Sequence, residues 1–270
     1  MSLSVIIPTL NAQARLPACL KILVPGAIDG LIREVIVSDA GSTDATLAIA
    51  EELGATLVQG ARGRGAQMRA AAAQARGTWL LFLHADTCLG PGWMSDIRRH
   101  LASRQARGAH RVGVFSLAFD EEGIAPSLVA GGAMVRTRLF KAPYGDQGLL
   151  IHREDYDAIG GFAPLPLFED VDIIDRLRRR FGRQTISIMP ARAVTSAARY
   201  RADGYARRVM RNFVCLSLYR LGFAPKKIKK IYDRDAGGNS VQRRTPASTK
   251  LAPPAGQGDA APTSQSRGKP

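Results

Sequence analysis

One short apolar segment constrains the fold of this chain more than any other part of the sequence. Residues 79–83 read Trp-Leu-Leu-Phe-Leu and run directly into His84-Ala85-Asp86. The segment is too short for a globular helix, but it is typical of a strand buried on both faces of an α/β sheet. Ligands of open α/β sheets bind beyond the carboxyl ends of the strands. We therefore expect His84 and Asp86 to face a ligand crevice rather than the core.

This His-x-Asp pair has two interpretations. An imidazole and a carboxylate at a sheet edge are suited to hold a divalent cation and, through it, a diphosphate. Alternatively, Asp86 only caps the helix that Pro91 begins, and His84 is a satisfied polar neighbour. The segment alone favours neither interpretation, so the decision depends on the rest of the chain.

Two earlier segments predict further elements of the same sheet. Residues 3–7 are apolar and end at Pro8-Thr9-Leu10-Asn11, where the proline should block further strand pairing. A helix is expected from 15 to 23, ended by Pro25-Gly26. Residues 34–39 predict a second strand, which stops on an acid.

The second predicted strand opens a βαβ unit. Asp39 is followed by Gly41 and by Ser42-Thr43-Asp44, a cluster that should cap a helix beginning at Ala45. An acid at the carboxyl edge of the sheet is placed to hydrogen-bond a ribose or a base. An ordinary βα turn explains the glycine and the caps, but it explains Asp39 less well.

A segment rich in glycine and arginine comes next. Residues 62–67 read Arg-Gly-Arg-Gly-Ala-Gln and open an alanine-rich helix over 68–76. Free backbone N–H groups and guanidinium donors converge at such a helix start, so this segment, with Arg64 and Gln67, is a candidate anion site. It is neither a GxxxxGKS phosphate loop nor a complete GxGxxG motif.

The middle of the chain continues the alternation of strands and helices. It predicts a strand at 112–119, a helix at 124–140, a strand at 149–152 and a last strand at 185–189. The polar, glycine-broken loop 141–148 lies between two of these elements. Loops on a rigid sheet carry binding residues, so this loop is expected to recognise an acceptor.

Three acids in four residues, Glu169, Asp170 and Asp172, head another predicted helix. Favourable interaction with the helix dipole accounts for acids in a first turn and is worth about 0.3–1 kcal/mol each. Three acids are more than this interaction with the helix dipole would require. Neighbouring carboxylates raise each other's pKa toward values that suit a general base.

These segments, taken in order and spacing, resemble the family 2 glycosyltransferases of GT-A fold, which are inverting enzymes that use nucleotide-sugar donors. The first three signatures of that family are matched by 4–11, 37–44 and 82–86. The fourth, an acid pair that heads a helix with a downstream arginine, is matched by 168–172 and Arg176. The resemblance covers residues 3 to about 195 and implies a GT-A-type, Rossmann-like α/β fold with a mixed, mostly parallel sheet flanked by helices.

The resemblance also implies a role for individual residues. The nucleotide sugar would be bound by residues of the first three signatures and the arginine-rich helix: Pro8, Thr9, Asn11, Asp39, Arg64, Gln67, Ala85 and Asp86. Asp86 would ligate Mn²⁺ or Mg²⁺ on the diphosphate, and His84 is a second candidate ligand. Asp170 would be the general base, with Glu169 as the alternative.

Asp146 and Gln147 resemble the acceptor-side residues of the family, although a plain turn explains them nearly as well. The chain also departs from the family pattern at two positions. His84 stands where the family usually has Asp, and Ala40 stands where a second Asp is common. The histidine can still bind a metal, but it removes a negative charge from the site.

The end of the chain has a different character. Residues 199–234 hold eleven Lys/Arg against two Asp, with one apolar helical stripe that comprises Met210, Phe213, Val214, Leu218 and Leu221. Such a helix either lies on an anionic membrane surface or packs on the core with a solvated basic face. We favour core packing for the stripe, and a membrane surface for the basic segment 226–230.

The chain divides into three predicted regions. Residues 1–198 form a glycosyltransferase domain, with a nucleotide-sugar half at about 1–90 and an acceptor half at about 110–198. Residues 199–234 form a basic amphipathic helical extension. From 235 to 270 the sequence has hardly any large apolar residue, which predicts a disordered tail.

Composition sets further limits. The 270 residues are 46% hydrophobic, which supports a large core. The net charge of +15 indicates a polyanionic partner: a nucleotide, a nucleic acid or anionic lipid. The cysteines, Cys19, Cys88 and Cys215, are odd in number and widely spaced, which favours neither disulfides nor a zinc site and fits a reducing cytoplasm. With no signal-peptide pattern and no apolar run near ~20 residues, we expect a cytoplasmic protein, with peripheral attachment to the inner face of the membrane as an option.

Three functions compete. The favoured one is inverting hexosyl transfer from a nucleotide-diphosphate sugar to a hydroxyl acceptor, lipid-linked or polysaccharide, of the kind found in cell-envelope synthesis. A nucleotidyltransferase should have a glycine-rich loop with Lys or Arg after the first strand, where this chain has Pro8-Thr9-Leu10-Asn11. A non-enzymatic protein that binds nucleic acid or membrane would leave the acid clusters without a role. No nucleic-acid partner is therefore expected.

Overall fold

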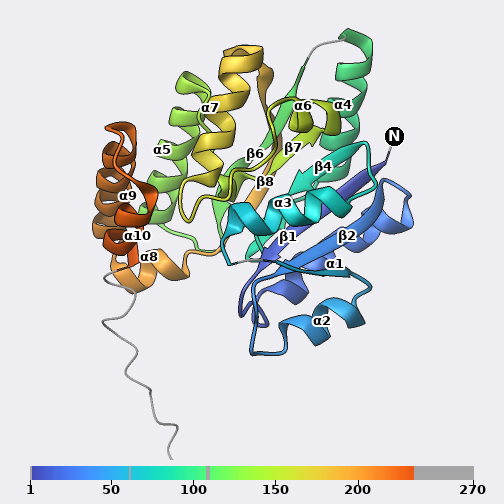
Figure 1. The fold of residues 1–270 in the computed structure, drawn as a ribbon, viewed down its shortest axis with the longest axis horizontal. Helices are drawn as coiled ribbons and strands as arrows, with labels where there is room; N and C mark the ends of the chain where they lie inside the picture. The colour runs from blue at the N-terminus through green and yellow to red at the C-terminus, as the bar shows by residue number, and fades with distance from the viewer. Residues whose placement is uncertain (1, 61, 108–109, 234–270) are drawn as a thin grey trace, which may run out of the picture.

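A computed structural model describes residues 2–60, 62–107 and 110–233, so the predicted tail at 235–270 lies outside the described residues. Its centre is one eight-stranded sheet in the order β3-β2-β1-β4-β7-β6-β8-β5 (Figure 1). The strands are β1 (Leu3–Thr9), β2 (Ile32–Asp39), β3 (Thr56–Gln59), β4 (Trp79–Phe82), β5 (Thr87–Leu89), β6 (Val112–Phe119), β7 (Leu149–His152) and β8 (Ile186–Thr195).

Ten α-helices and two short 3₁₀ helices lie within the described residues. The α-helices are α1 (Leu16–Ile28), α2 (Thr46–Glu52), α3 (Arg64–Gln74), α4 (Trp93–Arg107), α5 (Ile124–Phe140), α6 (Arg153–Ala158), α7 (Glu169–Phe181), α8 (Ala198–Asp203), α9 (Tyr205–Arg220) and α10 (Pro225–Asp233). The 3₁₀ helices are η1 (Gly145–Gln147) and η2 (Arg183–Thr185).

Strands β1 to β4 pair in parallel, so their carboxyl ends meet at one edge of the sheet. Beyond β4 the sheet becomes mixed, because β7 pairs antiparallel with both β4 and β6, and β5 pairs antiparallel with β8. Two cores cover its faces. Helices α1, α2 and α4 pack on one face, and α3, α6 and α7 pack on the other. The predicted α/β class with a mixed, mostly parallel sheet is confirmed.

The segment that opened the sequence argument is a central strand. Trp79–Phe82 is buried along its whole length and pairs with β1 on one side and β7 on the other. The strand at 112–119, the helix at 124–140 and the strand at 149–152 also begin and end where the sequence predicts. Burial explains the agreement for the strands, because short apolar runs have few alternatives to the centre of a sheet.

Both early prolines were expected to interrupt structure, and neither does. β1 continues to Thr9, and Pro8 pairs with Ser38 of β2. The carbonyl of Ile6, two residues earlier, accepts from Leu83 on the β4 side, so the missing Pro8 N–H faces the side where pairing with β4 has ended. Helix α1 passes through Pro25 and ends at Ile28. A Cβ on Gly26 would lie 2.5 Å from the Trp93 ring, so close packing on α4 holds this last turn.

The last strand is longer than predicted. β8 runs through Pro190 to Thr195, with a register shift opposite Phe115 and Ser116 of β6. Its additional residues pair with β5, a three-residue strand that the sequence did not indicate. The irregularity accommodates the proline, since proline lies in sheets at bulges and edges.

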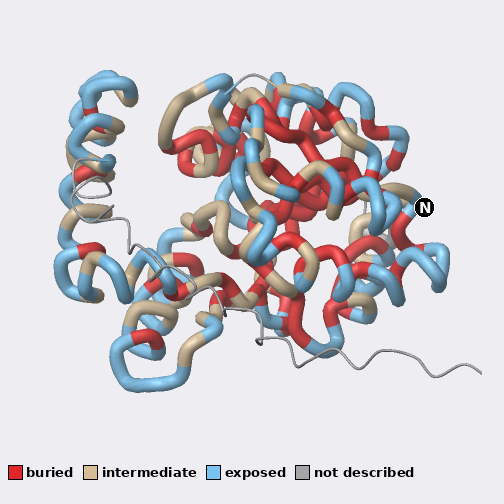
Figure 2. Tube along the Cα trace, turned by 90° about the horizontal axis from the view of Figure 1, so that it is seen from below, coloured by how far each residue is buried: buried red, intermediate tan, exposed pale blue. Residues whose placement is uncertain are grey.

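The C-terminal helices α8 to α10 lie beside α5 and α7 (Figure 1). We expected the apolar stripe of 199–234 to pack on the core, and this is wrong for most of its residues. Met210, Phe213, Val214 and Leu221 are 42–75% exposed. Helix α9 instead buries Arg208 and Cys215. Its orientation is fixed in part by ion pairs of Arg208 and Arg211 with Asp203. Figure 2 shows this difference, with red concentrated in the strands and pale blue and tan prevailing where α9 and α10 lie. Within the described residues, no helix is both long and apolar enough to cross a membrane.

Candidate functional site

The carboxyl ends of β1 and β2 are joined by a carboxylate with four donors. Thr9 Oγ1 donates to Asp39 Oδ1 at 2.8 Å, and the Ser42 hydroxyl donates to the same oxygen at 2.5 Å. The backbone N–H groups of Gly41 and Ser42 donate to Oδ2 at 2.8 and 2.7 Å. Burial alone would raise the pKa of Asp39, but these donors, led by Ser42, hold the pKa below its ordinary value.

The loop after β1 is held by the loop after β2. Asn11 has a left-handed backbone, with φ at 50°, and its amide oxygen accepts from Thr43 N at 2.9 Å. Its own N–H donates to the Ser42 hydroxyl at 2.8 Å. Asp44 accepts from Gln13 N and Thr46 N and so anchors the first loop. The helix begins at Thr46, and its N-cap residue is Ala45, with no side-chain cap hydrogen bond among the described residues, so the predicted cap is wrong in detail. Pro8, Thr9, Asn11 and Asp39 therefore lie together, and their contact with a nucleotide remains a proposal.

Helix α3 brings two further predicted residues to this edge. Gln67 is buried, and its Nε2 donates to the carbonyls of Thr9 and Ser38, at 2.7 Å each, so it braces the ends of β1 and β2. Arg64, one turn earlier, is half-exposed and lies 4.0 Å from a carboxylate oxygen of Glu169. It is the arginine of this segment whose charge reaches the acids of α7.

His84 and Asp86 follow β4 at the same edge, as expected, and line one cavity. Burial first, and then the positive charges of Arg64 and Arg199, lower the pKa of His84 well below its usual 6.5, so the ring is neutral and can act as a nitrogen ligand. Within the described residues, no group of three or more His, Cys, Asp or Glu forms a complete metal site. The pair fits a cation that takes its other ligands from a diphosphate and water, as Mg²⁺ does.

The acids at the start of α7 face the same cavity. Phe168, just before them, has φ at 67° and stacks on Tyr219 of α9 at 4.7 Å between ring centroids. Asp170 Oδ2 accepts from Gly145 N at 2.8 Å, which ties α7 to η1. Burial and the negative charge of Asp170 raise the pKa of Glu169 to about 7, against the pull of Arg64.

The two predicted acceptor-side residues, Asp146 and Gln147, lie in different environments. Gln147 is fully buried and donates to the Phe115 carbonyl at 3.1 Å, while its side-chain oxygen accepts from Thr137 at 2.8 Å. Asp146 lines the cavity, and its buried Oδ1 has no hydrogen-bond partner among the described residues. Burial raises the pKa of Asp146 to about 6, with Asp170 adding to the shift and Arg136 opposing it.

These residues surround a cavity of about 710 Å³. Six predicted residues line it: Arg64, His84, Asp86, Asp146, Glu169 and Asp170. Pro8, Thr9, Asn11, Asp39, Gln67, Ala85 and Gln147 are not among its lining residues. The C-terminal helices contribute side chains that the sequence did not single out: Arg199, Tyr200, Arg208, Asn212 and Tyr232. The only sequence signal for these was the density of Arg and Tyr in 199–234.

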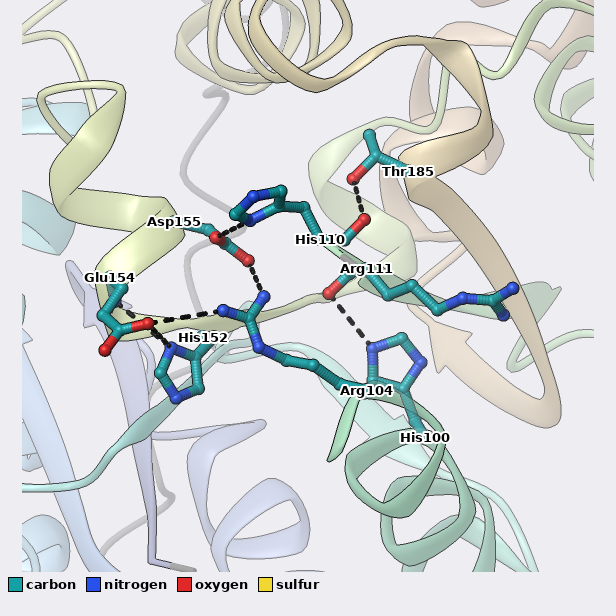
Figure 3. A network of polar contacts seen from close by, with 8 residues as sticks. All are labelled: His100, Arg104, His110, Arg111, His152, Glu154, Asp155 and Thr185. Atoms are coloured by element: carbon teal, nitrogen blue, oxygen red, sulfur yellow. Dashed lines mark hydrogen bonds and ion pairs between the residues drawn. The ribbon is translucent and has the colours of Figure 1, made fainter. Parts of the chain in front are cut away.

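A second polar cluster lies at the opposite end of β4 (Figure 3). Buried Asp155 accepts from Arg104 and pairs with His110 Nδ1 at 2.5 Å, while Glu154 pairs with Arg104 and His152. Burial lowers the pKa of His100 in this cluster to about 4. The cluster ties α4, α6 and β7 together and is separate from the site that faces the cavity.

Comparison with known proteins finds similar sequences for the first part of the chain. A family model described as Glycosyl transferase family 2 matches residues 4–118. Proteins named PGL/p-HBAD biosynthesis glycosyltransferase, from Mycobacterium bovis and Mycobacterium tuberculosis, are 42% identical over 99 residues, 32% of this chain and 36% of theirs. The chain therefore spans about a third of the length of these curated relatives.

Solved structures extend the similarity to the whole fold. Glucosyl-3-phosphoglycerate synthase from Mycobacterium tuberculosis, in complex with Mn²⁺, UDP and glucosyl-3-phosphoglycerate, is 21% identical, with a TM-score of 0.56 over 82% of this chain and 80% of that chain. The same enzyme with phosphoglyceric acid has a TM-score of 0.57 at 22% identity, with the same coverage. The fold is thus of the GT-A glycosyltransferase type.

Proposed function

We propose that the protein transfers a sugar from a nucleotide-diphosphate donor to a hydroxyl acceptor, with inversion at the anomeric carbon, since residues 4–118 match the Glycosyl transferase family 2 model. The observation that carries the proposal is the cavity that Asp86 and His84 share with Asp146, Glu169 and Asp170. The proposal is supported because the residues suited to hold a diphosphate and those suited to act as a base line the same cavity.

On the donor side, the loops after β1 and β2 would hold the nucleoside. Pro8, Thr9 and Asn11 would line its pocket, and Arg64 would attract the diphosphate. A Mn²⁺ or Mg²⁺ ion bound by Asp86 and His84 would stabilise the negative charge on the departing nucleoside diphosphate. The synthase structures described above contain Mn²⁺ and UDP, which supports this assignment.

On the acceptor side, Asp170 would remove the proton of the acceptor hydroxyl as its oxygen attacks the anomeric carbon. The Gly145 N–H fixes the orientation of Asp170, and Glu169 precedes it in the first turn of α7. Asp146 would accept a hydrogen bond from a second hydroxyl of the bound sugar or acceptor, because its Oδ1 is buried without a partner among the described residues. Each of these steps uses a carboxylate in its ionised form.

Residues 199–234 would also attach the protein to an anionic membrane surface. Lys226, Lys227 and Lys230 of α10 are exposed, as are Met210 and Val214 on the stripe of α9. Basic residues beside exposed apolar ones are typical of helices that lie in a membrane interface. Flotation with anionic liposomes tests this: the protein should float at low salt and detach at high salt, and a protein that never floats would exclude it.

The central test is a nucleotide screen. Thermal shift with UDP, GDP, dTDP and CDP, each with and without Mn²⁺, should show one nucleoside diphosphate that stabilises the protein only when the metal is present. At about 100 times its Kd, a ligand raises the free energy of unfolding by about 2.7 kcal/mol. A protein that no nucleoside diphosphate stabilises would contradict the proposed function.

A further inference from the structure

The walls of the 710 Å³ cavity differ from one end to the other. The end formed by the sheet edge, η1 and α7 is charged, with Arg64, Asp86, Asp146, Glu169 and Asp170. The opposite walls come from α5 and α9, which contact each other. Their lining residues are mostly apolar and include Leu128, Val129 and Ala133 on α5, and Val209, Phe213 and Leu216 on α9. The polar residues on these walls are Arg136, Arg208 and Asn212.

The apolar end reaches the protein surface. Leu128 is 70% exposed and Phe213 is 66% exposed, although both line the cavity. Gly132, one turn after Leu128, adds open space, because a Cβ built on it meets no atom within 4 Å. Large apolar side chains around an open space mark a site for an apolar ligand, since water gains little from contact with them.

We propose that the space between α5 and α9 is a subsite for the hydrocarbon part of the acceptor, with the acceptor hydroxyl at the acid end of the same cavity. This inference rests on the proposed glycosyl transfer, and it selects an amphiphilic alcohol over a polysaccharide. A polysaccharide would need many free hydrogen-bonding side chains along its length, whereas Leu128, Val129 and Phe213 offer none. Of the polar residues on these walls, Arg208 is paired with Asp203 and Arg136 donates to the Ala142 carbonyl, which leaves chiefly Asn212. A hydrocarbon chain is recognised by the apolar area that it buries.

The helices themselves offer matched controls. Ile124 lies one turn before Leu128 on α5 and is 81% exposed, but it does not line the cavity. Met210 on α9 is 62% exposed and is likewise absent from the lining, in contrast to Phe213. A membrane surface would contact both members of each pair, whereas a ligand inside the cavity would contact only Leu128 and Phe213.

The test measures binding of apolar probes to the full-length protein without membranes. The uncharged dye N-phenyl-1-naphthylamine would be bound first and then displaced by primary alcohols from hexanol to dodecanol. Affinity should rise about fourfold for each added methylene until the subsite is filled. L128Q and F213S should weaken dodecanol binding at least tenfold, while I124Q and M210S should leave it within twofold.

A variant that fills the subsite gives a second test of the dependence on chain length. Gly132→Leu places a side chain in the open space and should stop the gain in affinity at a shorter alcohol, without loss of melting temperature, because leucine has a higher helix propensity than glycine. Affinity that does not depend on chain length would overturn the inference, and so would equal losses in L128Q and I124Q.

The nucleotide screen on the same variants separates the two proposals. If nucleoside diphosphates bind with Mn²⁺ but alcohols show no dependence on chain length, the apolar subsite is wrong and glycosyl transfer stands. If alcohols bind as described but no nucleoside diphosphate binds, the proposed function fails, and the assignment of the subsite to an acceptor fails with it.

Discussion

The two halves of the site treat their carboxylates in opposite ways. In the nucleotide half, Asp39 receives four hydrogen bonds from its own chain, and its pKa lies below its ordinary value. In the acceptor half, Asp146 leaves a buried oxygen without a partner among the described residues, and its pKa rises to about 6. Both acids are buried or half-buried, so the difference comes from their donors rather than from exposure alone.

This contrast separates a structural carboxylate, Asp39, which we call the frame together with the loops that it holds, from the reactive carboxylates of the acceptor half. A carboxylate whose lone pairs are all occupied stabilises the loops around it and has little capacity to take a proton. A buried carboxylate with a free oxygen and a like charge nearby is costly for the fold, and such groups cluster at functional sites. We therefore expect substitutions in the acceptor half to change catalysis, and substitutions at Asp39 to change stability.

The largest effect should come from Asp170. Asp170→Asn keeps the size of the side chain but removes the base, so the rate of sugar transfer should fall by roughly 10²–10⁴ while donor binding persists. Radiolabelled transfer measures the rate, and proton NMR of the product checks that the anomeric centre is inverted. Glu169→Gln is the matched control and should lose less.

Two outcomes would contradict that assignment. If Asp170→Asn turns over at a near-normal rate, the base must be sought at Glu169, Asp172 or Asp146. Glu169 would then be the first alternative, because its pKa of about 7 suits proton removal near neutral pH. A product that retains the donor configuration would exclude a single displacement altogether.

The acceptor half should also set the pH dependence of the rate. Asp146 and Glu169 have raised pKa values of about 6 and about 7. If both carboxylates must be ionised for transfer, the rate should fall as the pH drops through this range. The decline should be about tenfold per pH unit between pH 7 and pH 6 and approach a hundredfold per unit below about pH 6, where both acids are protonated. The acids interact, so the measured midpoints belong to the cluster rather than to single residues. A profile that stays flat from pH 8 to pH 5 would show that sugar transfer does not require ionised Asp146 and Glu169.

The effect of the same acids on stability should have the opposite sign. The native state holds the proton on Glu169 more tightly than the unfolded chain, so the free energy of unfolding falls as the pH rises from about 4.5 to about 7. Glu169→Gln should therefore raise the melting temperature at pH 8 and change it less at pH 5. Thermal melts at the two pH values measure this, and a variant that is less stable at pH 8 would contradict the assigned pKa shift.

The metal site should give the next largest effect. Asp86→Ala removes the carboxylate ligand after β4, so it should abolish the Mn²⁺-dependent thermal shift by a nucleoside diphosphate and leave the melting temperature of the free protein nearly unchanged. His84→Asp restores the residue usual in the family and should keep or strengthen metal binding. Calorimetry that finds unchanged nucleotide affinity in Asp86→Ala would move the diphosphate site elsewhere.

The sequence predicted the sheet better than it predicted the contents of the cavity. β4 was recognisable because a short apolar run bounded by polar residues fits few other places, and His84 and Asp86 after it were expected at the sheet edge. The end of α1 was misplaced because its last turn depends on Trp93, about seventy residues away. Local patterns carry no information about such contacts.

The same limit applies to the roles of individual side chains. Gln67 and Gln147 stand in predicted binding segments, but their hydrogen bonds go mainly to the backbone and to Thr137. Arg199 and Tyr232 reach the cavity from helices more than a hundred residues beyond β4. Their position depends on how α8 to α10 pack against α5 and α7, which no motif spacing encodes.

The smallest effect should come from the frame, at Asp39. Asp39→Asn replaces one accepting oxygen with an NH₂ group, which leaves either the Gly41 and Ser42 N–H groups or the two hydroxyls facing a donor, so the free energy of unfolding should fall by about 1–3 kcal/mol.

In the native protein the lowered pKa of Asp39 contributes stability above its ordinary pKa of 3.8, and this contribution is lost as the pH falls through the lower folded value. The variant should therefore lose less stability between pH 5 and pH 3 than the native protein does. Urea melts at these two pH values measure both effects, with the exposed Glu51→Gln on α2 as the control. If Asp39→Asn melts like the native protein at pH 7, the four hydrogen bonds do not hold the loops, and the contrast between a saturated frame and unsatisfied acids fails.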